Sequence, residues 1–168
     1  QKNRLARALS MFEPLPAPVR SRLTSLVFNS QVRFAGTGGL RFEHLSPGRS
    51  VVVVRNRRKV QNHIGGVHAA AMALLGESAS GFLLGMHVPD DRLPLLKSMK
   101  LDYVKRASGQ LTATVSLTAE QIQHIRNNVK GELTLQVQIC DQVGVEPVLA
   151  EYVWAWVPKN RPASPMST

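Results

Sequence analysis

The sequence has very little cysteine and few aromatic residues. Cys140 is the only cysteine among 168 residues, so neither an intrachain disulfide nor a paired-cysteine zinc or redox site can form. The five histidines do not have the spacing of a metal-binding motif. Aromatic residues make up 5% of the chain and are not interleaved with basic ones, as they are in proteins that bind single strands. We therefore expect a cytoplasmic protein with no metal ion and no nucleic acid partner.

The chain also lacks a long apolar run without charge. The most apolar stretch, Val67–Met86, has Glu77 near its middle. A carboxylate at the centre of a membrane-spanning helix costs about 2.5–3.5 kcal/mol, so we expect no membrane insertion. An amphipathic surface helix would carry more polar residues, so this stretch predicts a helix that protein surrounds on most sides.

Positive charge is concentrated in the first third of the chain. The 21 basic and 11 acidic residues give a net charge of +10. Residues 1–60 contain 12 basic and 2 acidic side chains, whereas residues 61–168 contain 9 of each. A basic surface of this kind favours phosphate-bearing partners, although any single arginine can equally be a solvated surface residue.

The residue pattern predicts helices first and strands later. Short helical stretches over Lys2–Phe28 are broken at Pro14, Pro16 and Pro18, and extended structure begins at Gln31 and includes Val32–Glu43. The four consecutive valines 51–54 indicate a strand covered on both faces. After the apolar helix we expect four extended segments: Ser98–Ala107, Leu111–Leu117, Leu133–Ile139 and Val148–Val157, with a short helix starting at Thr118.

This order predicts an α+β fold in which an antiparallel sheet, largely a meander, wraps around one long central helix. We divide the chain into an N-terminal helical extension (1–30), a sheet-and-helix domain (31–157) and a flexible tail (158–168). A single sheet covers the helix on one side only, so we also expect dimerisation.

Two features of the central region suggest chemistry. Gly65 and Gly66 let the backbone approach a ligand, and the free N–H groups near His68–Ala70 at the helix start favour an oxyanion or a phosphate. Glu77 lies among apolar residues in the same helix, where a carboxylate can act as general base or nucleophile. The alternatives are a turn shaped by two glycines and a Glu77 on one exposed stripe with Ser78 and Ser80.

Helix geometry separates these two features. His68 and Glu77 are nine residues apart, which corresponds to about 900° of rotation and ~13 Å along the helix axis. They therefore point to opposite sides and cannot act on the same substrate atom within one chain. If both are functional, one chain supplies the helix start and a second chain supplies Glu77.

The stretch from Asn62 to Ala70, together with Leu74–Ala79, resembles the hotdog-fold acyl-CoA thioesterases of the phenylacetate-pathway type. It is more closely similar to uncharacterised bacterial hotdog proteins grouped as a domain of unknown function. The resemblance covers about Gly36–Val157, and Leu101–Gly109 resembles the third strand and following turn of these proteins. Its pattern is an Asn six positions before a His and an acidic residue nine positions after it, here Asn62, His68 and Glu77.

The resemblance implies a hotdog-fold homodimer or tetramer that hydrolyses an acyl-CoA or acyl-carrier thioester at its interface. Glu77 would be the nucleophile or the base for the attacking water, and Asn62 of the other subunit would position the water or the thioester. The N–H of Ala69 would hold the oxyanion, and His68 would be an orienting group rather than a base. The sequence has Glu77 where these proteins usually have Asp, and Ala69-Ala70 where they have Gly-Gly.

No cofactor is expected except coenzyme A as part of the substrate. Residues expected to bind substrate, partly through its phosphates, are Gly65, Gly66, Arg57, Arg58, Lys59, Lys105 and Arg106. The alternatives are a hotdog acyl-thioester dehydratase or hydratase and a non-catalytic module that binds an acyl group or coenzyme A.

Overall fold

The computed structural model describes residues 2–159. The elements follow in the order α1 (Arg4–Ser10), α2 (Ala17–Gln31), α3 (Arg33–Gly38), β1 (Arg41–Ser46), β2 (Arg49–Val54), the 3-10 helix η1 (Arg58–Val60), α4 (Ala69–Gly85), β3 (Arg92–Tyr103), β4 (Leu111–Ser116), α5 (Ala119–Asn127), β5 (Gly131–Asp141) and β6 (Val148–Pro158).

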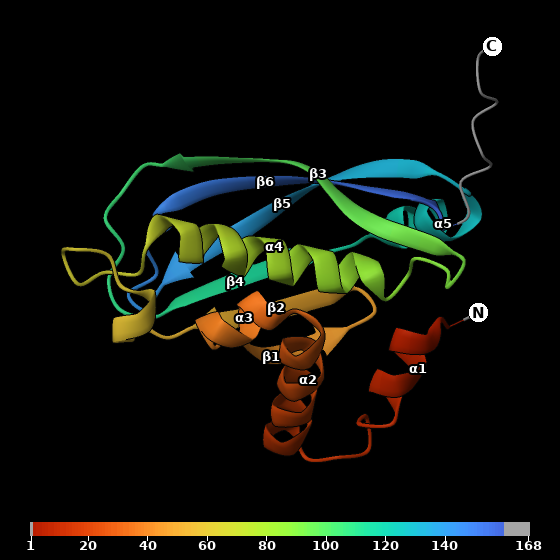
Figure 1. The fold of residues 1–168 in the computed structure, drawn as a ribbon, viewed down its shortest axis with the longest axis horizontal. Coiled ribbons are helices and arrows are strands. Elements are labelled where there is room, and N and C mark those ends of the chain that lie inside the picture. The colour runs from red at the N-terminus through yellow and green to blue at the C-terminus, as the bar shows by residue number, and fades with distance from the viewer. Residues whose placement is uncertain (1, 160–168) are drawn as a thin grey trace, which may run out of the picture.

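The strands form one antiparallel sheet in the order β1-β2-β4-β5-β6-β3, and α4 lies along one face of it (Figure 1). The predicted α+β architecture is therefore confirmed. The expected strand of valines is β2, in which Val52, Val53 and Val54 are all buried. No helix in the described part of the chain combines the length and the apolar character needed to cross a membrane.

Strand β3 differs from the prediction in place and in length. It pairs with β6 at the edge of the sheet and does not continue into a meander with β4. It also begins at Arg92 rather than near Ser98, and so includes Pro94. Proline has no N–H to donate, and an edge strand tolerates this because one of its sides has no neighbouring strand.

The N-terminal region contains more helix than the sequence predicts. Residues Arg33–Gly38, expected to be extended, form α3, which ends at Gly39 with a left-handed φ of 68°. Pro18 does not break a helix but lies in the first turn of α2, where a missing N–H costs nothing. The division at residues 30 and 157 stays a prediction, and the tail from residue 160 onward lies outside the described residues.

Two sets of contacts fix the N-terminal helices on the sheet-and-helix unit. Phe28 of α2, Phe42 of β1 and Phe82 of α4 pack with ring centroids 4.7–4.9 Å apart. The buried side chain of Asn3 accepts a hydrogen bond from the N–H of Ala6 and so caps α1. Its amide group also donates to the carbonyl of Gly85 at 2.7 Å, which ties α1 to the end of α4.

Helix α4 packs very closely on β6. The Tyr152 hydroxyl donates to the carbonyl of Ala73 at 2.9 Å, and the indole N–H of Trp154 donates to Ser80 at 2.9 Å. These bonds need the helix backbone near the sheet, and Gly76 allows it because a Cβ there would lie 2.7 Å from Cε2 and Cζ of Tyr152.

We expect Gly76→Ala to lower the melting temperature by several degrees, because the added Cβ forces α4 away from Tyr152 and overpacking of a core typically costs about 1–3 kcal/mol. Gly85→Ala is the matched control, since its Cβ would meet Leu5 at an ordinary 3.8 Å. Thermal unfolding of both variants checks this, and an equal effect of the two would contradict the close-approach explanation.

Candidate functional site

The loop before α4 is organised around Asn62. Its side-chain oxygen accepts hydrogen bonds from the N–H groups of Ile64 and Gly66, each at 3.1 Å. Gly65 adopts a φ of 79°, a left-handed conformation that favours glycine. The Asn62 oxygen is therefore used inside the loop, whereas its amide N–H groups have no acceptor within residues 2–159 and are available as donors.

His68 caps the start of α4. Its Nδ1 accepts a hydrogen bond from the N–H of Ala70 at 3.0 Å, which places the ring hydrogen of the neutral form on Nε2. The carbonyl of His68 accepts from Ala71 and Met72. Among the described residues nothing accepts from the N–H of Ala69, which makes it the available donor at this helix end.

The basic candidates gather at the same end of the molecule. Arg57, Arg58 and Lys59 are exposed in and beside η1, and Lys105 and Arg106 are exposed in the loop after β3. The two loops lie side by side, since a Cβ on Gly66 would be 3.9 Å from the carbonyl oxygen of Ala107 (Figure 1). The Asp141 carboxylate accepts from the N–H of Ser108 and holds this second loop in place.

Lys59 and His68 also line a small hollow of about 180 Å³ beside the start of α4. Phe34 and Thr37 of α3 line the same hollow. Helix α3, whose residues the sequence pattern predicted to be extended, thus contributes to the wall of the hollow that His68 lines.

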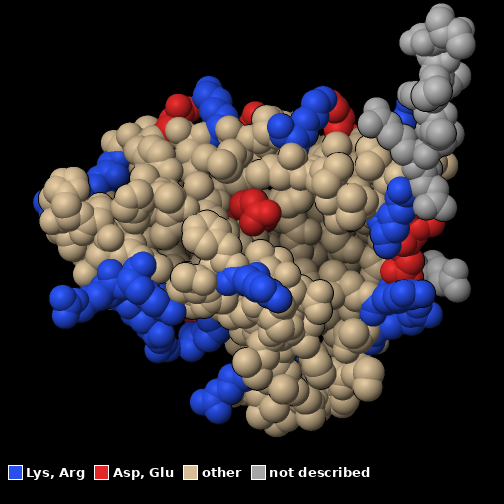
Figure 2. All heavy atoms as spheres, viewed as in Figure 1, with Lys and Arg blue, Asp and Glu red and all other residues tan. Residues whose placement is uncertain are grey.

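Glu77 lies elsewhere, in the floor of a mostly apolar groove of about 660 Å³. On this face of the molecule one acidic side chain is surrounded mainly by uncharged surface, with a basic side chain just below it (Figure 2). Glu77 is half-buried and its only side-chain hydrogen bond within the described residues is a long one of 3.4 Å from Ser78. Burial raises the pKa of Glu77 above the ordinary carboxyl value of 4.5. A carboxylate with a raised pKa and no ion pair within the described residues is suited to accept a proton.

Within one chain the candidate residues therefore form two separate groups. Asn62, His68, Ala69 and the basic residues lie at the N-terminal end of α4, whereas Glu77 faces a different hollow. This separation is what the nine-residue spacing on one helix requires.

Tyr103 is a neighbour of the site that the sequence pattern did not single out. Its hydroxyl donates to the carbonyl of Ala69 at 2.8 Å, so the end of β3 is joined to the first turn of α4. The residue is about half exposed, at 49%. A tyrosine at a strand end gives no signal in sequence, because the contact depends on how β3 lies relative to α4.

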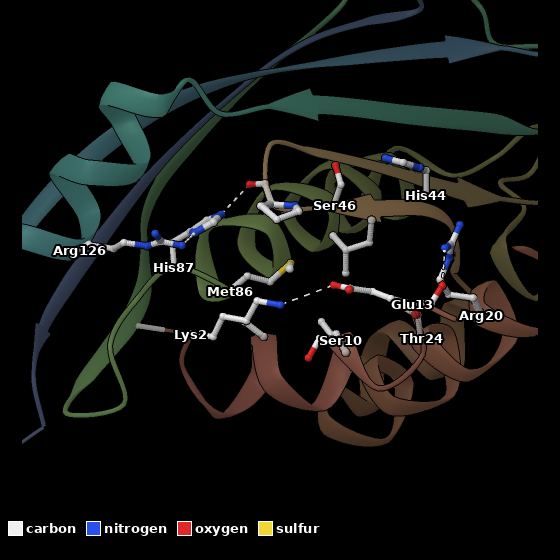
Figure 3. A pocket seen from close by; sticks show the side chains of 14 residues that line it. Lys2, Ser10, Glu13, Arg20, Thr24, His44, Ser46, Met86, His87 and Arg126 are labelled. Carbon is white, nitrogen blue, oxygen red and sulfur yellow. Dashed lines mark hydrogen bonds and ion pairs between the residues drawn. The ribbon is translucent and has the colours of Figure 1, made fainter. Parts of the chain in front are cut away.

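Another cavity, of about 260 Å³, lies between α1, α2, the turn after β1 and the end of α4 (Figure 3). The buried His87 there donates from Nε2 to the carbonyl of Pro47 at 2.6 Å and accepts at Nδ1 from Arg126 at 3.1 Å. Both ring nitrogens are engaged, so His87 links chain segments. None of the predicted site residues lines this cavity. Within residues 2–159 no three or more His, Cys, Asp or Glu side chains are grouped to hold a metal ion.

Several solved structures similar to this one carry thioesterase names. A Pseudomonas aeruginosa protein of unknown function, named a probable thioesterase, is 25% identical with a TM-score of 0.74 over 82% of this chain and 95% of its own. A mutant thioesterase from Staphylococcus aureus is 20% identical, with a TM-score of 0.65 over 75% of this chain and 99% of its own. A Haemophilus influenzae thioesterase is 11% identical, with a TM-score of 0.65 over 89% of this chain and 96% of its own.

These likenesses confirm the hotdog fold, with the sheet wrapped around α4. No curated protein matches the sequence significantly. The profile of one family, described as a domain of unknown function (DUF4442), matches residues 20–157. That match begins inside α2 and ends in β6, so it spans the whole sheet and the central helix. The chain therefore belongs to the DUF4442 family and is a thioesterase-like hotdog protein.

Proposed function

We propose that this protein hydrolyses a thioester between an acyl group and coenzyme A or an acyl carrier, at a site shared by two copies of the chain. The observation that carries the proposal is Glu77, a half-buried carboxylate without a cation partner among the described residues, in the floor of an apolar groove. Desolvation raises its pKa, which strengthens it as a base at neutral pH.

In the proposed reaction, Glu77 takes a proton from a water molecule while the water oxygen attacks the thioester carbon. The N–H of Ala69 in the other protomer donates to the developing oxyanion, at a helix start where the backbone dipoles favour negative charge. When the intermediate collapses, the carbon–sulfur bond breaks and the sulfur leaves as a thiol that takes up the proton. The products are a carboxylic acid and the free thiol.

Asn62 of the second protomer orients the attacking water or the thioester. The Asn62 oxygen already accepts hydrogen bonds from Ile64 and Gly66, so the side chain would act through its N–H groups. These groups would donate to the water or to the thioester oxygen. The hydrogen bond from Asn56 to the carbonyl of Gly65 further fixes this loop, so the donor is held in place before substrate binds.

Strand β3 supports a two-chain arrangement. It is a 12-residue edge strand, and its outer side pairs with no strand within the described part of the chain. Leu93, Leu95 and Met99 are each 44–51% exposed along it. A long edge with apolar side chains is a template for pairing, and pairing with a second β3 gives a two-fold dimer in which both chains contribute to each site.

We expect Glu77→Gln to lower kcat by about 100-fold or more, because general-base catalysis contributes 10²–10⁴-fold. Wild-type kcat/KM should rise with pH through the raised pKa of Glu77, above 4.5, and this limb should be missing in the variant. Thiol release from a panel of acyl-CoAs measures both.

The same variant has a built-in control for folding. A carboxyl whose pKa is raised in the folded state destabilises the fold when it is ionised, so Glu77→Gln should melt at a higher temperature than wild type at neutral pH. The difference should disappear well below pH 4.5, where the Glu77 carboxyl is protonated in both the folded and the unfolded state. Unchanged turnover together with this stability gain would show that Glu77 is not the catalytic base.

A subunit-mixing experiment tests the shared site. Asn62→Ala chains and Glu77→Gln chains are each nearly inactive alone, but a heterodimer contains one site with both residues intact and one with both lesions. Random exchange gives half heterodimers, so about a quarter of wild-type activity should return by two-fold symmetry. If one chain supplied both residues to a site, mixing would restore nothing, and exchange confirmed with tagged subunits makes that result decisive.

The basic residues beside the first loop are expected to bind the phosphates of coenzyme A. Replacing Arg57 and Arg58 with Ala should raise KM for a CoA thioester several-fold more than for a pantetheine thioester, which lacks the nucleotide phosphates. The difference should shrink in high salt, which screens exposed charges. Arg22→Ala combined with Arg49→Ala removes two other exposed charges as the control. Equal losses on both substrates would place the phosphates elsewhere.

A further inference from the structure

The apolar groove that begins at Glu77 extends far beyond the carboxylate. Its floor continues along one side of α4 through Gly81 to Gly85. Eight residues of helix cover ~12 Å. Gly81 and Gly85 have no side chain to fill the groove at these two positions, while Ser78 and Phe82 of the same helix also line it.

The walls of the groove come mainly from the two N-terminal helices. Leu5 and Ala8 of α1 are three residues apart and so share one helix face, which lines the groove. Val27 and Phe28 of α2 line it as well, and Trp154 of β6 closes it towards the sheet. The family match begins at residue 20, so the α1 wall lies outside the matched region.

Helix α1 is held firmly enough to act as a wall. Asn3 bonds both to the end of α4 and to the first turn of α1, and the backbone N–H of Arg4 donates to the carboxylate of Asp90 at 3.0 Å. The opposite face of α1, with Ala6 and Leu9, is buried against the cavity of Figure 3. The groove therefore exists before any ligand binds.

We propose that α1 and α2 form the binding site for the acyl chain and limit its length, which makes medium-chain acyl thioesters, of about 8–12 carbons, the preferred ligands. An extended chain advances ~1.2 Å per bond, as in a polypeptide, so the ~12 Å floor accommodates about ten bonds. The walls are mostly apolar, with Arg4 and Lys159 as their basic residues, and a mostly apolar lining favours a hydrocarbon. The position of Glu77 at one end of the glycine-lined stretch places the thioester there. The identity of the reacting group rests on the proposed function, whereas the chain-length limit does not.

The test measures binding with thioether analogues of acyl-CoA, which cannot be hydrolysed. Calorimetry with S-butyl-, S-octyl-, S-decyl-, S-dodecyl- and S-hexadecyl-CoA should give affinities that rise by up to about fourfold per methylene and stop rising near 10–12 carbons. Ala8→Trp places an indole in the groove from an exposed position. It should weaken S-decyl-CoA at least tenfold and leave S-butyl-CoA within twofold.

Two further variants separate the groove from general damage. Val27→Trp fills the groove from α2 and should have the same chain-length effect, whereas Arg7→Trp puts the same side chain on α1 outside the groove and should have none. Affinity independent of chain length, equal losses for S-butyl- and S-decyl-CoA, or the same loss in Arg7→Trp would overturn the inference. So would a change of oligomeric state in Ala8→Trp with no change in binding, which would mean that a second copy occupies the groove.

Turnover of the corresponding thioesters distinguishes this inference from the proposed function. Length-dependent binding without hydrolysis would disprove the hydrolase and support the acyl-chain site. Hydrolysis that depends on Glu77, combined with binding that does not depend on chain length, would support the hydrolase and overturn the acyl-chain site.

Discussion

The position of α4 on the sheet is the constraint on which the other features depend. Tyr152 reaches the helix backbone only because Gly76 has no side chain, and its hydrogen bond to Ala73 then fixes the rotation of the helix about its axis. With Gly76 turned towards β6, the next residue, Glu77, points about 100° away and reaches the groove. The same rotation directs His68 towards the hollow beside η1. A small residue in the core thus determines where two polar side chains on the surface face.

This geometry also explains why a site made by one chain would be incomplete. The donors at the start of α4 and the carboxylate in its middle are fixed on one rigid helix, so no change of side-chain conformation can bring them together. The outer edge of β3, which pairs with no strand among residues 2–159, lies on the same sheet that holds the helix. Pairing two such edges would relate the two helices by a two-fold axis. Catalysis and assembly would then depend on the same interface.

Much of the fold could be predicted because its signals are local. The alternation in β4 and β5, the capping box at Thr118 and the apolar run of α4 each depend on neighbours in sequence, and each was predicted correctly. The errors concern α3 and the start of β3, where glycines and a proline give ambiguous local signals. Glu77 stood out as a charge among apolar residues. Tyr103 and the groove walls of α1 and α2 did not, because they are defined by packing between distant segments.

The two positions that differ from the resembling thioesterases are compatible with the site. The oxyanion donor is a backbone N–H, which alanine supplies as well as glycine does, and alanine favours a helix by up to about 1 kcal/mol per residue. Ala69 and Ala70 are both exposed, so their methyl groups do not disturb the packing of α4. Glu77 is longer than Asp by one methylene, and its carboxylate therefore extends further from a helix that Gly76 holds close to the sheet. The longer side chain offsets the recessed backbone, so the carboxylate still reaches the groove surface where a second chain can meet it.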